Sequence, residues 1–246
     1  IPSGFGKRES KVYIKNADFT MVRFNFDMDM SKIRAGEDDL LYDILLGGNN
    51  SRFYIELSER RGVFYDVSGS VEKCKNIGSF AFSYEVKAGD LCEALRISLS
   101  ILSDIKERLL SDDECMKHGY VLGAELLLDD PRELGYTVAY DTEMMGAEYR
   151  SISERAELYR SITPERIREA ARAIFRAENM VIGIKGSKRK INSIELEAII
   201  NDFALGKLSC QFAQFFFTLK IIVITLSKDI FKLFFQHSKK SVFICG

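Results

Sequence analysis

The stretch LLGGNNSRFYIELSERRGVFYDV, residues 45–67, carries the strongest local signals in the chain. Its adjacent glycines permit the positive φ at which helices end. They separate two segments, 36–47 and 52–61, that we expect to be helices. A strand should open at Tyr65, because aromatic and β-branched residues favour strands. The order helix, glycine break, helix and strand is the unit around which the other elements are placed.

Alternating apolar and polar residues predict strands on both sides of this stretch. In residues 22–30, and again in 80–86, every second side chain is large and apolar, which gives one buried and one solvated face. A short apolar run at 180–184 predicts a further strand. Half-buried strands favour an antiparallel or mixed sheet with helices packed on one side. We therefore expect the α+β class, with a twisted, mostly antiparallel sheet covered by helices.

Capping signals mark where the later helices begin. Asp90 and Ser111 are each followed three residues later by Glu, the spacing of a capping box. Pro164 opens another helix, since proline is tolerated in a first turn. A last helix is expected near residues 190–204. The chain should thus continue from the second strand into a long helical run, one short strand and a final helix.

Composition separates the end of the chain from its body. Of 246 residues 46% are hydrophobic, which is ample for a core, and the net charge is −1. Residues 207–246 hold six lysines against one acid and eight of the eighteen phenylalanines, so residues 1–206 are weakly acidic. An acidic body argues against nucleic acid as a partner, because phosphate binding needs a clustered basic surface.

The segment 207–246 admits three interpretations. A transmembrane anchor is excluded, because Lys220, Lys228 and Asp229 interrupt every window long enough to span a bilayer. An amphipathic surface helix is an alternative. We favour the view that these residues are A/T-rich codons read past a frameshift, and that they do not belong to the domain. Residues 1–10 are then an N-terminal segment or linker remnant, and residues 11–206 form one domain.

The cysteines indicate a reducing compartment. Their number, five, is odd, and they are widely spaced without a C-x-x-C pair, so neither a disulfide framework nor a structural zinc site is suggested. The first residues lack the apolar region of a signal peptide, and the chain begins with Ile, as a fragment or trimmed product would. We expect a cytoplasmic protein with reduced thiols.

The stretch 45–67 resembles the second half-domain of the insulinase/pitrilysin zinc metallopeptidases. The shared pattern is a leucine, two glycines, a Ser-Arg pair, a helix, Arg-Gly and a strand-opening tyrosine. The resemblance covers roughly residues 10–205 and is more specific at 45–67 than elsewhere. It implies a half-domain of the processing-peptidase type, a twisted sheet covered by helices.

The catalytic half of that family holds zinc with an H-x-x-E-H helix. This chain has only two histidines, His118 and His237, so it cannot contain that motif. The resemblance therefore implies a non-catalytic half that is inactive alone, with zinc in a partner half. The expected partners are that zinc-bearing half, from the same gene product or a separate subunit, and a peptide substrate.

The resemblance points to Tyr65 as the functional residue. In the family, an Arg and a Tyr seven residues later reach toward the zinc centre, where they bind substrate and support the tetrahedral intermediate. Both are hydrogen-bond donors suited to a developing oxyanion. Here Ser58 replaces the expected Arg, and Arg61 or Arg60 is a possible substitute. The alternative is a packing tyrosine on the same strand face as Val67.

Two further residues favour structural roles. Arg52 and Glu56 lie one turn apart and are expected to form an i, i+4 ion pair, with Arg52 supporting the glycine turn. His118 lies on an apolar helical stripe, where a packed core histidine is expected rather than a ligand.

Three assemblies account for a half-domain without zinc: the second piece of a split peptidase gene, the non-catalytic subunit of a heterodimer, or a purely structural relative such as the core subunits of a respiratory complex. The serine at position 58 favours a structural or interaction subunit with no role in proteolysis. The tyrosine at position 65 favours a catalytic assembly. A regulatory binding module unrelated to peptidases is the alternative if the match at 45–67 is coincidental.

Overall fold

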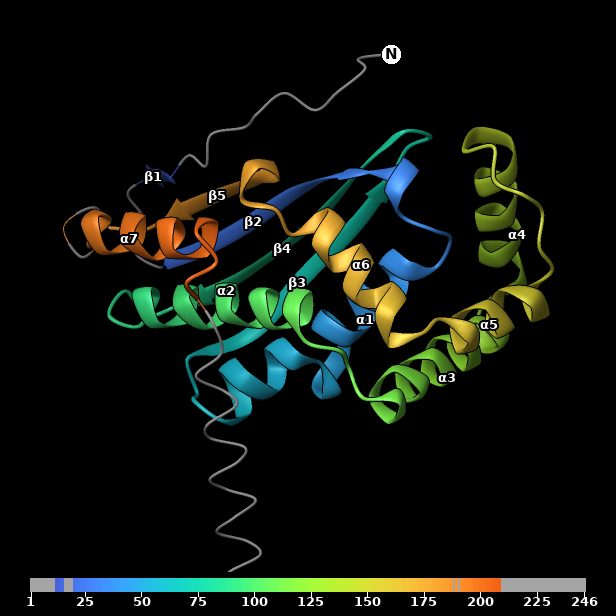
Figure 1. Ribbon diagram of the computed structural model, residues 1–246, viewed down its shortest axis with the longest axis horizontal. Coiled ribbons are helices and arrows are strands. Elements are labelled where there is room, and N and C mark those ends of the chain that lie inside the picture. Colours follow the sequence, from blue (N-terminus) through green and yellow to red (C-terminus); the bar gives the residue numbers. More distant parts are fainter. Residues whose placement is uncertain (1–11, 16–19, 188, 190, 209–246) are drawn as a thin grey trace, which may run out of the picture. The chain divides into compact units, whose positions relative to one another are not determined.

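One twisted sheet organises the domain in the computed structural model, which describes residues 12–15, 20–187, 189 and 191–208 (Figure 1). Its strands are β1 (Val12–Lys15), β2 (Thr20–Asp29), β3 (Phe64–Lys73), β4 (Ile77–Val86) and β5 (Met180–Lys185). Their order in the sheet is β1-β5-β2-β4-β3. The pairs β2/β4, β2/β5 and β3/β4 are antiparallel, and β1 pairs with β5 in parallel. The expected mostly antiparallel sheet is confirmed.

The core lies against one face of β2 and β4. Phe24 pairs with Phe82 and Phe26 with Phe80 across the two strands, and all four rings are buried. Phe175 packs edge-on against both Phe26 and Phe80, with ring centroids 5.1 Å apart in each case. The residues between them point to the other face, which is polar. The alternation predicted from the sequence is therefore the alternation of a sheet with one buried face.

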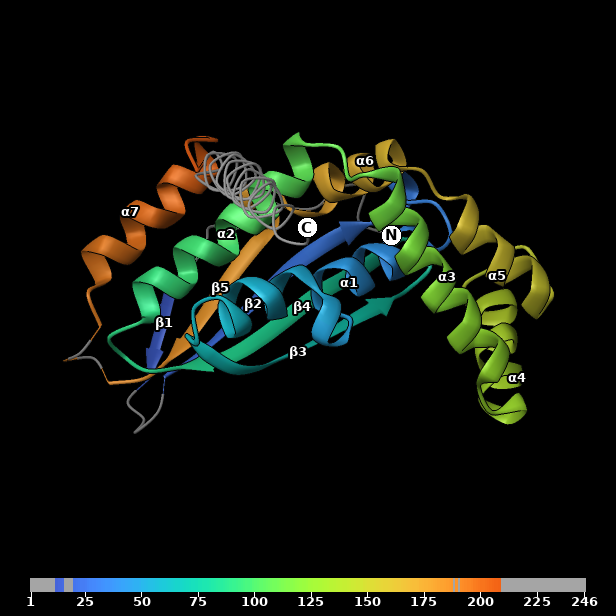
Figure 2. The ribbon, with the colours of Figure 1, turned by 90° about the horizontal axis from the view of Figure 1, so that it is seen from below.

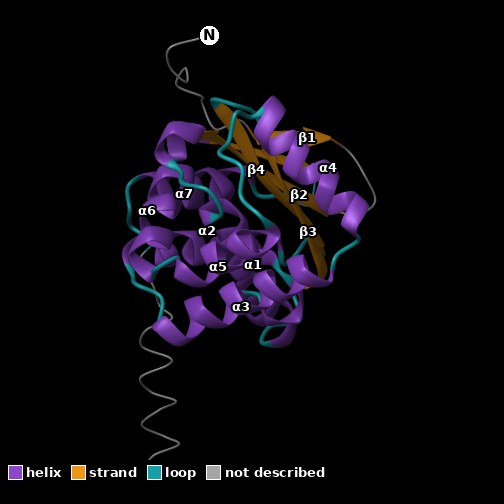
Figure 3. Cartoon of the chain, turned by 90° about the vertical axis from the view of Figure 1, so that its right-hand side faces the viewer, coloured by secondary structure: helices purple, strands orange, loops and turns teal. Residues whose placement is uncertain are grey.

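Most of the helices gather on the buried face, and α4 lies apart from them (Figure 3). The described α-helices are α1 (Glu37–Leu46), α2 (Leu91–Glu107), α3 (Asp112–Leu128), α4 (Pro131–Ala139), α5 (Ile152–Ser161), α6 (Pro164–Ile174) and α7 (Ser193–Ala204). Short 3-10 turns are η1 (Met30–Lys32), η2 (Gly48–Asn50) and η5 (Ala177–Asn179), and two segments are π-helices, η3 (Tyr54–Glu59) and η4 (Tyr140–Met144). α1 and α6 pack on β3 and β2, and α2 packs between α6 and α7.

The long helical run resolves into α2 to α6, and α3 to α5 lie together at one end of the domain (Figures 1 and 2). Small residues bring α3 and α5 close: a Cβ at Gly119 would lie 2.6 Å from the Tyr159 carbonyl oxygen, and one at Gly123 would lie 3.2 Å from that of Ala156. α4 follows α3 directly and buries none of its residues. It is the helix least embedded in the domain.

The capping predictions are partly right. The Ser111 hydroxyl accepts a hydrogen bond from the Glu114 amide at 3.1 Å, so it caps α3. Asp90 precedes α2, but its side chain makes no capping hydrogen bond. The reciprocal capping box lies at Ser151 and Glu154, at the start of α5. The starts of these helices were therefore predicted correctly. The side chains of Glu93 and Glu114, which were expected to complete the capping boxes, instead form ion pairs with arginines.

β3 lies at one end of the sheet order and is held by α1. The Tyr42 hydroxyl donates to the Gly69 carbonyl oxygen at 3.0 Å. A Cβ at Gly69 would lie 2.8 Å from Leu46 Cδ1 and 3.0 Å from Tyr42 Cε2, so a larger residue would have to push these two side chains of α1 aside.

The expected segment 207–246 lies almost wholly outside the described residues, and its separation from the domain stays a prediction. Among the residues that the structure describes, no helix combines the length and apolarity needed to cross a bilayer.

Candidate functional site

Tyr65 lies near the start of β3, at an irregularity of the sheet. Phe64 pairs with Val86 and Val67 pairs with Tyr84, so β3 has one more residue than β4 between the two pairs. This extra residue is a β-bulge, which breaks strict alternation and often redirects a side chain beside an active site. The side chains of residues 64–66 lie outside the described part of the chain. The expectation that Tyr65 shares the face of Val67 therefore does not follow from alternation.

Ser58, in the position of the expected Arg, lies in the π-helix η3 and is half-buried. Its carbonyl oxygen accepts from the Gly62 amide at 2.9 Å, and Gly62 has φ +60°, so the chain turns sharply into β3. The segment 52–61 was expected to be a helix, and it is one, but with i→i+5 bonds over Tyr54–Glu59. Such π segments are frequent at functional sites. They also change which residues share a face, so α-helical spacing cannot be used to align the arginines with Ser58.

The two arginines after η3 contact nearby carboxylates. Arg61 pairs with Glu93 of α2 at 3.1 Å, with side chains 39% and 53% exposed, and Arg60 pairs with Glu56. Burial raises the pKa of the Glu56 carboxyl, and the neighbouring arginines oppose that rise. An exposed pair such as Arg61–Glu93 contributes only about 0–1 kcal/mol. The ion pair between Arg61 and Glu93 therefore contributes little to the stability of the domain.

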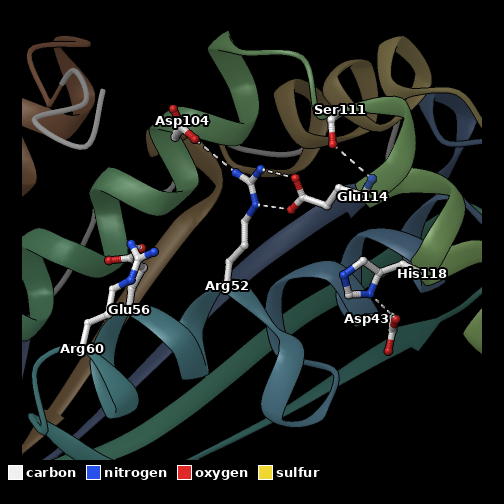
Figure 4. Close-up of polar contacts among 8 residues, drawn as sticks. All are labelled: Asp43, Arg52, Glu56, Arg60, Asp104, Ser111, Glu114 and His118. Carbon is white, nitrogen blue, oxygen red and sulfur yellow. Dashed lines mark hydrogen bonds and ion pairs between the residues drawn. The ribbon is translucent and has the colours of Figure 1, made fainter. Parts of the chain in front are cut away.

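Arg52 joins three elements (Figure 4). Its Nε and Nη2 donate to the Glu114 carboxylate at 2.8 and 3.0 Å, and its Nη1 donates to Asp104 Oδ2 at 3.1 Å. Burial opposes the charge, but these two carboxylates outweigh burial and raise the pKa of Arg52. The expected pair with Glu56 is wrong: Glu56 pairs with Arg60, and Arg52 links the start of η3 to α2 and α3.

His118 is buried, as expected of a core histidine, and its Nδ1 lies 2.6 Å from Asp43 Oδ2 (Figure 4). The two glycines that follow α1 are needed for different reasons. Gly48 has φ +64°, which favours glycine. At Gly47 a Cβ would lie 1.9 Å from Asp43 Oδ1, so glycine leaves room for the carboxylate that holds His118. The partner Asp43, four residues before Gly47, was not anticipated.

A second buried charge cluster fixes the far end of β3. Lys73 Nζ lies 2.8 Å from Asp38 Oδ2 and 2.8 Å from Asp39 Oδ1, and the Tyr159 hydroxyl donates to Asp39 at 3.1 Å. Burial, followed by repulsion from Asp39, raises the pKa of Asp38, although Lys73 opposes the rise. Sequence periodicity gave no sign of this cluster, because its members come from α1, β3 and α5.

Metal ligands do not cluster in the described part of the chain, where no three His, Cys, Asp or Glu side chains meet. His118 and Asp43 are two such groups, but they bind each other. The described side chains of this region are therefore engaged in ion pairs and hydrogen bonds with one another.

Comparison with known proteins identifies the domain. Residues 2–118 match the family model described as the peptidase M16 inactive domain. The chain contains a peptidase M16 inactive domain. The expected likeness to the insulinase/pitrilysin metallopeptidases is confirmed, and so is its assignment to a non-catalytic half.

Relatives agree with this M16 assignment. The chain is 24% identical over 160 residues to an uncharacterized zinc protease of Mycobacterium tuberculosis, covering 62% of this chain and 35% of that protein. It thus spans about a third of the length of that relative. The fold is similar to an M16 inactive domain from Pseudomonas fluorescens, with TM-score 0.65, 16% identity and coverage of 74% of this chain and 45% of that one. It is also similar to a chain in complex III2 from Candida albicans, with TM-score 0.63, 10% identity and coverage of 79% and 49%.

Proposed function

We propose that this M16 inactive domain pairs with an H-x-x-E-H-bearing half, in the same gene product or a separate subunit, and encloses and positions a peptide for cleavage by zinc in that half. The observation that carries the proposal is the match over residues 2–118 in a chain whose two histidines exclude the zinc motif. A protein with the inactive domain alone needs the other half to form a metal site.

Within that assembly, Tyr65 supplies a hydrogen bond to the substrate carbonyl as negative charge develops on its oxygen. The β-bulge that contains Tyr65 and the π-helix that contains Ser58 support this role, because both distortions are frequent beside active sites. Ser58 cannot supply the guanidinium of the family pattern, and Arg61, whose ion pair with Glu93 is exposed, is the proposed substitute.

A structural or interaction subunit with no role in proteolysis is the second candidate. Two observations favour it: serine stands where the family has arginine, and the fold is similar to a chain of a respiratory complex. This candidate predicts the same partner surface and no contribution from Tyr65.

A cytoplasmic location belongs to the proposal as well. The described cysteines, Cys74, Cys92 and Cys115, are free thiols, which suits a reducing compartment.

The test is reconstitution with the H-x-x-E-H protein encoded upstream or in an adjacent gene. We expect no peptide cleavage by the chain alone and cleavage by the complex. Tyr65→Phe should lower kcat roughly 10²- to 10³-fold, since it removes one donor to the oxyanion, and leave binding of the two halves unchanged. Tyr120→Phe, on the exposed surface of α3, is the matched control and should retain full kcat.

Ser58→Arg in the same complex should raise kcat or lower KM, because it restores a second donor. An active complex in which neither Tyr65→Phe nor Ser58→Arg changes kcat or KM would exclude a substrate role and select the structural candidate. A chain that never associates with the zinc-bearing half would overturn the proposal as a whole.

A further inference from the structure

The segment 127–149, here called the α4 lobe, exposes an unusual number of large apolar side chains. They are Leu127, Leu128, Tyr136, Tyr140, Met144 and Tyr149, of which Leu128 is 86% and Tyr136 70% exposed. α4 continues directly into η4, and the rings of Tyr136 and Tyr140, four residues apart on this helical segment, stack with their centroids 6.3 Å apart. No residue of either helix is buried. An exposed apolar group of this size marks an interaction surface.

The exposure of the helical segment 131–144, α4 with η4, indicates what kind of partner covers it. Most of the stability of a helix in a protein comes from packing of its apolar side, and no residue of this segment is buried. Its N-cap Asp130 and first-turn Pro131 set where it begins but add no burial. A transient ligand would leave the lobe uncovered for most of the time. The structure therefore favours a permanent partner surface over a passing peptide.

Charge restricts the chemistry of that partner. The α4 lobe contains six carboxylates and a single arginine, Arg132. Asp141 is neutralised by Arg155 at 2.7 Å, but Glu133 and Glu143 are exposed. A second copy of the lobe, a nucleic acid or an anionic membrane would be repelled. A surface that combines lysine or arginine with apolar groups is complementary.

A depression of about 320 Å³ adjoins the lobe and is lined by three carboxylates and one cation, together with Tyr149, Leu158 and Ser161; the charged residues are Glu148, Glu154, Glu157 and Arg150. Glu148 pairs with Arg150 at 3.2 Å and Glu157 with Arg160 at 3.5 Å, and Glu154 accepts from Ser151. Exposed pairs of this kind exchange partners easily. The depression can therefore accept a cationic side chain beside the apolar groups of the lobe.

We propose that the α4 lobe is the docking surface for a basic and apolar patch on the zinc-bearing half. This inference rests on the proposed function and adds to it the place and the chemistry of the contact. The lobe holds the two halves together, while the Tyr65 region faces the substrate.

The experiment measures the Kd between the whole chain and the purified H-x-x-E-H half. Tyr136→Ser combined with Met144→Ser should raise Kd at least about tenfold, since buried aromatic anchors dominate interfaces. Glu143→Lys should raise Kd and make it less sensitive to added NaCl. Ile194→Ser, 81% exposed on α7, and Glu197→Lys, exposed on the same helix, are matched controls and should leave Kd within about twofold.

Hydrogen exchange of the α4 amides gives a second readout. Amides of residues 131–144 should be weakly protected in the free chain and strongly protected in the complex, and the thermal midpoints of all variants should match wild type.

Unchanged Kd for the lobe variants, in a wild-type chain that does bind, would overturn this inference and leave the proposed function standing. Failure of the wild-type chain to bind would overturn both. Protection of α4 in the free chain that disappears on dilution would identify a second copy as the occupant. Protection that disappears on truncation after Gly206 would identify residues 207–246, and either result would overturn the assignment to the zinc-bearing half.

Discussion

The two ends of α3 contrast in how they use charge. Near its start, Glu114 and His118 meet Arg52 and Asp43, and every one of these side chains has a partner inside the chain. Beyond its end, the α4 lobe carries exposed carboxylates and exposed apolar side chains in the same 23 residues, 127–149. The first region links three parts of the domain, whereas the second leaves apolar and acidic side chains exposed to solvent. The difference shows that one helix can be an internal scaffold at one end and, in our proposal, an attachment point at the other.

The largest expected effect is at the scaffold end. Arg52→Met should lower the free energy of unfolding by about 3 kcal/mol, because it removes the cation that Glu114 binds and leaves Asp104 with Arg108 alone, in a site where the Arg52, Asp104 and Glu114 side chains are at most 31% exposed. Arg61→Met is the control and should cost less than about 0.5 kcal/mol, since its pair is exposed. Urea unfolding measures both. Equal losses for the two variants would remove the distinction between a buried and an exposed pair.

Substitution of one glycine near His118 and of one in α4 compares the two regions directly. Gly47→Ala should cost about 2 kcal/mol, because the new Cβ must displace the Asp43 carboxylate from His118. Gly135→Ala, inside α4, meets no atom within 4 Å and should stabilise the chain by about 0.5–1 kcal/mol through helix propensity. Thermal and urea unfolding report both changes. A destabilising Gly135→Ala would show that α4 already packs against part of this chain.

The smallest effect concerns pH at the cluster of Lys73, Asp38 and Asp39. Because burial raises the folded-state pKa of Asp38 above its ordinary 3.8, the folded chain binds a proton there more readily than the unfolded chain. This contribution to stability is fully present below pH 3.8 and is lost as pH rises through the raised pKa.

The free energy of unfolding of wild type minus that of Asp38→Asn should therefore fall as pH rises from about 4 to 7, by no more than about 1 kcal/mol. Asp39 keeps Lys73 paired in the variant. A difference that grows with pH would mean that the ion pair with Lys73 outweighs burial.

Sequence patterns predicted what depends on local periodicity and missed what depends on distant partners. Alternation at 22–30 and 80–86 located β2 and β4, and the glycine pair located the end of α1, because each signal lies within a few neighbouring residues. The capping spacing at Ser111 located the start of α3. It also predicted that the Glu114 carboxylate would accept a hydrogen bond at that start, whereas this carboxylate binds Arg52, 62 residues away in the chain.

The candidate site was predictable in position but not in backbone shape. The resemblance indicated Tyr65 and Ser58, yet the bulge in β3 and the π-helix η3 each insert one residue relative to regular geometry. No residue type marks such an insertion in a single sequence. The direction of a side chain at these two positions therefore could not be predicted without the conformation of the backbone.

The bond from Tyr42 to the Gly69 carbonyl oxygen bears on the behaviour of the chain in a crowded cell. β3 ends the sheet, and outer strands of this kind recruit strands from other molecules and start aggregates. A molecule that added to β3 near Gly69 would have to displace the Tyr42 hydroxyl and push α1 aside. One phenol thus helps to protect this outer strand from unwanted strand addition.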